Sequence, residues 1–79
     1  MQITINESNI VVELGKITYD LSFKEVLQFM IDNLDSEWKI IAKSLKNADN
    51  NIIYITLMAN DLKVKEAITL AFKKANYDK

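Results

Sequence analysis

The 79-residue chain contains no cysteine, no histidine, no proline and no arginine, and it contains a single glycine. Without cysteine, no disulfide bond or thiolate metal site can form, and nothing indicates an oxidising compartment. Without histidine and cysteine, the usual dyads and triads of acid-base and nucleophilic catalysis cannot be assembled. We therefore expect a protein that is not an enzyme and that holds no cofactor and no metal.

The absence of arginine bears on the kind of partner. All 10 basic residues are lysines, and the formal net charge is −1. Arginine supplies the bidentate fork that reads guanine edges and clamps phosphates, and a near-neutral chain lacks the broad attraction that non-specific DNA binding needs. Another protein, or a second copy of the chain, is therefore a more favoured partner than nucleic acid. The alternative is a small nucleic-acid-associated regulator that uses the surface lysines Lys43, Lys46, Lys63, Lys65, Lys73 and Lys74.

Long hydrophobic runs are also missing. No apolar run approaches the ~20 residues needed to cross a bilayer, and the opening MQITINES lacks the basic and apolar regions of a secretory signal. These features predict a cytoplasmic protein that does not contact a membrane. The composition, with 49% apolar and 27% charged residues, is typical of a globular chain, and the length fits a single domain over residues 1–79.

The first 21 residues predict strands. Residues 2–6 (QITIN) and 9–14 (NIVVEL) are short runs rich in β-branched residues. Gly15, which can adopt a positive φ, separates the second run from KITYDL at 16–21. This pattern predicts an N-terminal β-hairpin or a three-stranded meander.

Helical signals begin at Ser22, which forms with Glu25 the S-x-x-E spacing of a capping box. An apolar stripe with helical periodicity follows, made of Phe23, Val26, Leu27, Met30, Ile31, Leu34, Trp38, Ile41, Ala42 and Leu45. The stripe stays in phase over residues 23–46, which predicts one long helix. Poor helix formers at 32–36 predict instead a break and two short helices, and the sequence leaves both interpretations open.

A turn at 47–51 (NADNN) precedes the apolar run IIYITLM at 52–58. The run is apolar on every helical face and rich in β-branched and aromatic residues, so it predicts a buried strand, with a helix as the alternative. Asn60 or Asp61 can then cap a C-terminal helix. The stripe of that helix comprises Val64, Ala67, Ile68, Ala71, Phe72 and Ala75. The predicted fold class is α+β, with the helices on one face of the sheet.

The segment LMANDLKVKEAI at 57–68 resembles the helix-turn-helix join of HEAT-type repeats. The chain holds no second copy of this segment, whereas such repeats bury a core only when several are stacked. The resemblance therefore assigns no family, and a repeat architecture is the second interpretation of the fold.

Two groups of polar side chains have metal-like spacing. Asn47, Asp49 and Asn51 match positions 1, 3 and 5 of a calcium loop. Ile52 and Met58 stand where that loop needs a glycine and a bidentate glutamate. The acidic residues of the middle helical segment lie beside the apolar stripe, where carboxylates keep a helix solvated. Neither group predicts a metal site.

Three apolar residues lie off the helical stripes. Phe29 and Leu70 point roughly 130°, and Ile40 about 150°, from the centres of their apolar faces. Scattered surface apolar residues are common, and a helix buried on two sides would also need them. The other interpretation is a contiguous patch for a partner or for self-association. We therefore predict Phe29, Ile40 and Leu70 as the partner-binding residues of a small non-catalytic protein-binding module, such as an adaptor, inhibitor, chaperone or subunit.

Overall fold

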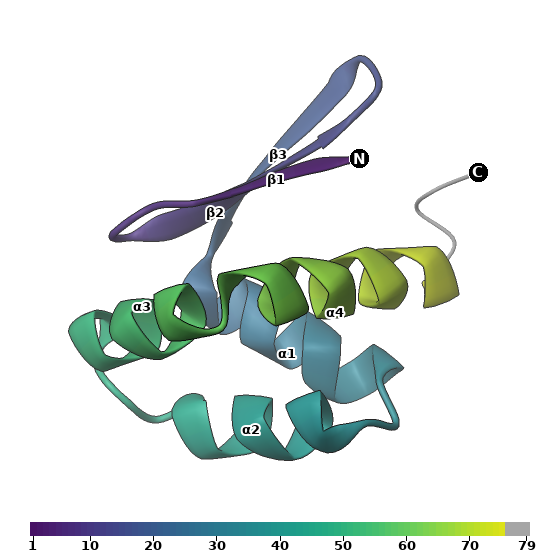
Figure 1. Cartoon of the computed structure of the whole chain (residues 1–79). Helices are drawn as coiled ribbons and strands as arrows, with labels where there is room; N and C mark the ends of the chain where they lie inside the picture. Colours follow the sequence, from purple (N-terminus) through teal and green to yellow (C-terminus); the bar gives the residue numbers. More distant parts are fainter. Residues whose placement is uncertain (76–79) are drawn as a thin grey trace.

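The computed structural model describes residues 1–75. Its fold is α+β, as predicted, with a three-stranded antiparallel sheet followed by four helices that lie on one face of the sheet (Figure 1). The strands are β1 (Gln2–Ile5), β2 (Asn9–Leu14) and β3 (Ile17–Ser22). The helices are α1 (Phe23–Asn33), α2 (Glu37–Leu45), α3 (Asn50–Ala59) and α4 (Asp61–Lys74).

The sheet is a meander with the strand order β1-β2-β3. Ile5 pairs with Ile10 beside the first turn, and Leu14 pairs with Ile17 across the second. Gly15 lies in that second turn with a φ of 59°, a left-handed conformation that costs other residues about 1–2 kcal/mol. Side chains alternate along the strands, and those that enter the core from β1 and β2 are Ile3, Ile5, Ile10 and Val12.

The helical segment after the sheet forms two helices, which decides between the two interpretations of the sequence. The predicted capping box is present, because Ser22 Oγ accepts a hydrogen bond from Glu25 N while Glu25 Oε1 accepts one from Ser22 N. Helix α1 stops before Leu34, whose extended backbone (φ −110°, ψ 145°) cannot continue it. The Ser36 side chain then starts α2 by accepting a hydrogen bond from Trp38 N.

The strand predicted at 52–58 is wrong, because these residues belong to helix α3. The Asp49 side chain accepts a hydrogen bond from Ile52 N and caps the helix at its start. Ile53 and Leu57 are the buried residues of α3, and they lie one turn apart on the same side. The segment is apolar all round because its outward face is also apolar, and not because protein encloses it as it would a central strand.

Helix α4 follows α3 after a turn at Asn60. The cap predicted at Asn60 does not form, since this side chain donates to Thr56 O at 3.0 Å and makes no cap hydrogen bond to α4. Asp61 lies in the first turn of α4 and forms an ion pair with Lys65 at 3.3 Å. In the view of Figure 1, α4 continues from the end of α3 along the long direction of the molecule.

One cluster of buried side chains joins the sheet to all four helices. Helix α1 is its central element, because it contacts α2, α4, β2 and β3. Every buried side chain among residues 1–75 is apolar, and Trp38 is one of them, as its place on the helical stripe predicts. None of the helices in this part of the chain is long and apolar enough to cross a membrane.

Candidate protein-binding surface on helix α3

The outward side of α3 is apolar. Ile53 and Leu57 turn inward and are almost fully buried, with exposures of 0% and 1%. Ile52, Ile55 and Met58 turn outward and keep exposures of 50%, 59% and 42%. At 100° per residue, Ile55 lies opposite the buried pair and the other two flank it. Large aliphatic side chains therefore line the solvent side of this helix over two turns.

No residue of α3 is charged, because its sequence is NNIIYITLMA. The Thr56 hydroxyl lies within the helix and donates to Ile52 O at 2.9 Å, so that this polar group is satisfied locally. A surface helix normally carries charged residues on the face opposite the core, and a helix that is apolar all round is normally buried. Helix α3 is exposed along one side without the charges that such a side usually carries.

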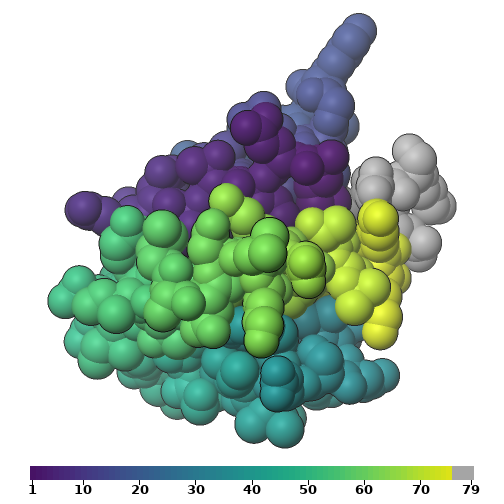
Figure 2. Space-filling view, viewed as in Figure 1, coloured from purple at the N-terminus to yellow at the C-terminus, as the bar shows by residue number. Residues whose placement is uncertain are grey.

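Helix α4 begins with a further exposed apolar side chain, Leu62, which is 73% exposed. Leu62 and Leu70 line the same shallow groove of about 370 Å³, whose polar lining includes Lys65 and Glu66. Figure 2 shows α3, in green, and α4, from light green to yellow, as an outer layer with no other described segment in front of them. We define the α3 face as Ile52, Ile55, Met58 and Leu62.

The structure places the three residues predicted from the sequence in different surroundings. Leu70 is 45% exposed and lines the groove next to the α3 face, while Ile40 is 71% exposed on α2. Phe29 is half-buried, and its ring centroid lies 4.6 Å from that of Phe72. The partner-binding role of these residues stays a prediction, with Leu70 beside the α3 face and Phe29 packed against α4.

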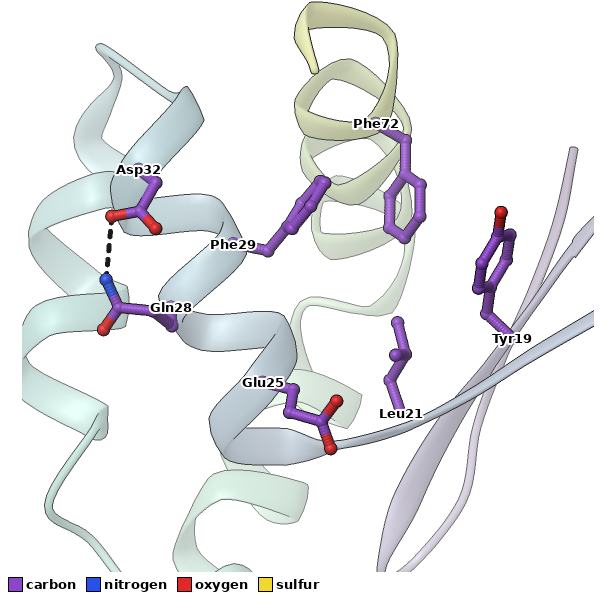
Figure 3. Close-up of a pocket in the computed structure, with 7 residues that line it drawn as sticks. All are labelled: Tyr19, Leu21, Glu25, Gln28, Phe29, Asp32 and Phe72. Atoms are coloured by element: carbon purple, nitrogen blue, oxygen red, sulfur yellow. Dashed lines mark hydrogen bonds between the residues drawn. The ribbon is translucent and has the colours of Figure 1, made fainter. Parts of the chain in front are cut away.

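Phe29 also lines a separate groove of about 340 Å³ between β3, α1 and α4 (Figure 3). Its apolar walls come from all three elements and its rim is polar. The lining residues are Tyr19, Leu21, Glu25, Gln28, Phe29, Asp32 and Phe72. Gln28 donates a hydrogen bond to Asp32 at 2.8 Å along the rim, which fixes these two side chains on the surface of α1.

Two of the six lysines proposed to contact nucleic acid have intramolecular partners. Lys65 pairs with Asp61, and Lys46 Nζ donates to Gln28 Oε1. Lys24, outside that group, donates through Nζ to Lys46 O and to Ala48 O, the latter at 2.7 Å, and ties α1 to the end of α2. Lys24 and Lys46 thus link α1 to the end of α2, whereas the Lys65–Asp61 pair lies within α4.

The metal-like groups of the sequence are used for other purposes. Asp49 is the middle residue of the calcium-like spacing, and its side chain is already used as the N-cap of α3. Within residues 1–75, no three acidic side chains lie close enough together to hold a metal ion.

Comparisons of the chain with protein families, with curated proteins and with solved structures find no match in any of the three. The α3 face is therefore interpreted from its own geometry. Sequence reasoning missed its members Ile52, Ile55, Met58 and Leu62, because it assigned most of them to a buried strand. One signal could have found them: residues 50–60 contain no charged side chain.

Proposed function

We propose that this chain is a small non-catalytic protein-binding module, such as an adaptor, inhibitor, chaperone or subunit, that acts through the exposed apolar face of helix α3. The observation that carries the proposal is the uncharged outward side of α3, where Ile52, Ile55 and Met58 remain exposed. Contiguous apolar patches on a monomer commonly mark sites where another protein binds. Apolar contact at the centre of an interface supplies most of its affinity.

The composition also supports a binding role. The chain lacks histidine and cysteine, which leaves the usual nucleophile and base pairs without members. Its lysines are balanced by acidic residues to a net charge of −1, so that electrostatic attraction to a polyanion is weak. Leu70 adjoins the α3 face through the groove that it shares with Leu62, which makes it the most favoured of the three residues predicted from the sequence.

The test is affinity capture with three tagged baits: the wild type, Ile55→Glu and Ile17→Glu. Ile17 is 56% exposed, close to the 59% of Ile55, and it lies on β3 away from α3. Ile17→Glu is therefore the matched control, because it makes the same substitution at an equally exposed position outside the α3 face. The extract comes from the source organism and is treated with nuclease before mass spectrometry. We expect a stoichiometric protein partner with the wild type and with Ile17→Glu, and a loss of at least about tenfold with Ile55→Glu, because a charge would be desolvated at the centre of the interface.

Other outcomes would contradict the proposal in distinct ways. Equal capture by all three baits would move the binding site away from α3, and Ile40→Asp and Leu70→Asp would then test the residues predicted from the sequence. Capture that disappears after nuclease treatment would favour the nucleic-acid alternative. That alternative requires affinity to fall steeply between about 50 and 200 mM salt.

A further inference from the structure

We propose that strand β3 is a second binding site of this protein, which takes an extended basic peptide as an added antiparallel strand whose apolar side chains enter the groove of Figure 3. This site is separate from the α3 face, because it lies between β3, α1 and α4. The inference is carried by the hydrogen-bonding groups of the open sheet edge, by the groove beside them and by the charge around both.

Strand β3 is an edge of the described sheet, whose strand order is β1-β2-β3. In an antiparallel ladder, every second residue bonds to the neighbouring strand, and the residues between them turn their N–H and C=O groups to the other side. Leu14 pairs with Ile17 across a two-residue turn, so this is the hydrogen-bonded pair that closes the hairpin. The backbone groups of Thr18 and Asp20 therefore face the open side, where no backbone group of residues 1–75 bonds to them.

Ser22 supports this alternation. It lies two residues beyond Asp20 and so belongs to the same set of the ladder. Its N–H donates to Glu25 Oε1, outside the sheet, although Asn9 of β2 lies opposite it in the register. Thr18 and Asp20 therefore each present one donor and one acceptor to an incoming strand.

Strand β3 lacks the usual protection of a sheet edge. Natural edges are commonly blocked by proline, by lysine, by a bulge or by short length. The sequence of β3 is ITYDLS, which contains neither proline nor lysine, and its six residues pair one-to-one with β2 without a bulge. The other edge strand, β1, has four residues and contacts α3. Strand β3 is therefore the edge that can accept a further strand.

The groove beside β3 can receive side chains of the added strand. Tyr19 and Leu21 alternate with Thr18 and Asp20 along β3, and they point toward the helices, where they line the groove of about 340 Å³ (Figure 3). Directly opposite residues of neighbouring strands place their side chains on the same face of a sheet. Peptide residues opposite Tyr19 and Leu21 therefore direct their side chains to the groove, where Phe29 adds to the apolar wall. Main-chain bonds then supply affinity and the groove supplies specificity.

The charge around the site favours a basic peptide. Glu25 and Asp32 lie on the rim of the groove, and the described residues that line it include no lysine. Lys46 reaches Gln28 from α2 but does not line the groove. Asp20 is exposed on the other face of β3, so a lysine or arginine between the apolar residues of the peptide would lie opposite it, as a stabilising cross-strand pair. A second copy of β3 carries the same acid and no base, and it is not complementary in this way.

The first probe is a synthetic peptide in which four lysines alternate with phenylalanine, leucine and valine. We expect saturable one-to-one binding to the purified full chain in isothermal titration calorimetry at low salt. The same peptide with glutamates in place of the lysines should bind at least about tenfold more weakly, because like charges would meet at Asp20. Amide hydrogen exchange at Thr18 and Asp20 should slow when the lysine peptide is bound.

Backbone methylation of the peptide tests the added strand itself. Peptide residues opposite Thr18 and Asp20 exchange both hydrogen bonds with β3 in an antiparallel pair, and these residues are lysines in the proposed register. Methylating the backbone nitrogens of the two central lysines should therefore lower the affinity at least about tenfold, since two hydrogen bonds are lost. Methylating two apolar residues, whose N–H groups face away from β3, should change it by no more than about twofold. Both methylated peptides keep the same side chains and charge.

Matched variants of the protein locate the bound peptide. Asp20→Lys should lower the affinity for the lysine peptide at least about fivefold and raise that for the glutamate peptide, because the sign of the cross-strand charge is reversed. Glu66→Lys makes the same change in charge on α4, outside this groove, and should leave both affinities within about twofold. Circular dichroism checks that each variant is folded.

Absence of saturable binding by the lysine peptide would overturn the inference. Equal losses for the two methylated peptides, or for Asp20→Lys and Glu66→Lys, would also overturn it, as would unchanged amide exchange at Thr18 and Asp20. A dimer of the free protein that the peptide dissociates would identify a second copy as the occupant and would overturn it too. None of these outcomes bears on the α3 face, which the capture experiment with Ile55→Glu tests.

Discussion

Helices α1 and α3 are nearly equal in length, with 11 and 10 residues, but they divide their apolar side chains differently. Helix α1 buries Phe23, Val26, Leu27 and Met30 and carries charged residues on its solvent side. Helix α3 buries Ile53 and Leu57 and places equally large aliphatic side chains on its solvent side. The buried apolar residues of α1 stabilise the fold, whereas Ile52, Ile55 and Met58 of α3 remain about half exposed and contribute less to it. That difference predicts where mutations will affect stability and where they will affect association.

The largest expected effect is in α1. Leu27 is 1% exposed, and Leu27→Ala should lower the free energy of unfolding by about 2–5 kcal/mol, because it removes buried methyl groups and leaves a cavity. Urea unfolding followed by the fluorescence of Trp38, the single tryptophan, measures this change. A loss below about 1 kcal/mol would mean that α1 is not the central element of the core.

A smaller effect is expected at the start of α1. Ser22→Ala removes the side chain that accepts from Glu25 N, and we expect a loss of about 1–1.5 kcal/mol in the free energy of unfolding. Ser22→Asp is the matched control, since Asp caps helices as well as Ser does, and it should retain most of the stability. If the two variants were equally destabilised, the capping box would not be the cause.

The corresponding change in α3 should cost slightly less. Asp49→Ala removes a single cap hydrogen bond to Ile52 N, without the reciprocal bond present at α1, and should lower the free energy of unfolding by about 0.5–1 kcal/mol. Asp49→Asn should restore it. A helix frayed at its start should also weaken partner capture through the α3 face, which capture with the same variants measures.

The smallest expected effect on monomer stability is at the centre of the α3 face. Ile55→Ala should change the free energy of unfolding by less than about 0.5 kcal/mol, because Ile55 stays 59% exposed in the folded state. Ile53→Ala, two residues earlier and fully buried, is the matched control and should cost about 2–5 kcal/mol. Equal losses for the two variants would remove the distinction between the two sides of α3.

The same contrast explains which parts of the fold the sequence could predict. The start of helix α1 was predicted correctly because its signals are local: a capping box at Ser22 and Glu25, followed by apolar residues at helical spacing. Its end was left open, since the apolar stripe continues in phase into α2. The N-terminal strands were predicted, with a hairpin or a meander left open, because their short β-branched runs are separated by turn residues, including Gly15. Both sets of signals depend on residues close together in the chain.

Helix α3 was assigned to a strand because periodicity carries no information when every face is apolar. A helical stripe is recognised by contrast with a polar face, and IIYITLM has none. The capping residue Asp49 was visible in the sequence, but it was interpreted as part of a turn. The feature that makes α3 a candidate binding surface is the same one that concealed its secondary structure.

None of the four residues of the α3 face was predicted as a binding residue, and the binding role of Phe29, Ile40 and Leu70 stays a prediction. Ile40 and Leu70 are exposed, as their positions off the stripes indicate. Phe29 lies off the stripe of α1 but is half-buried, because α1 contacts helices on two sides and Phe29 meets Phe72 from α4. A helical wheel describes one helix against one buried side, so it cannot assign a residue that a second neighbour covers.

The turn at Gly15 and Lys16 has a practical use that is independent of the α3 face. Figure 1 shows the tip of the β2–β3 hairpin projecting beyond the body of the molecule, and a Cβ atom built on Gly15 would meet nothing within 4 Å. Exposed loop tips of this kind accept insertions better than any other part of a domain. A fluorophore or a short epitope introduced there would provide a handle for distance measurements and imaging, with the helical layer left unmodified.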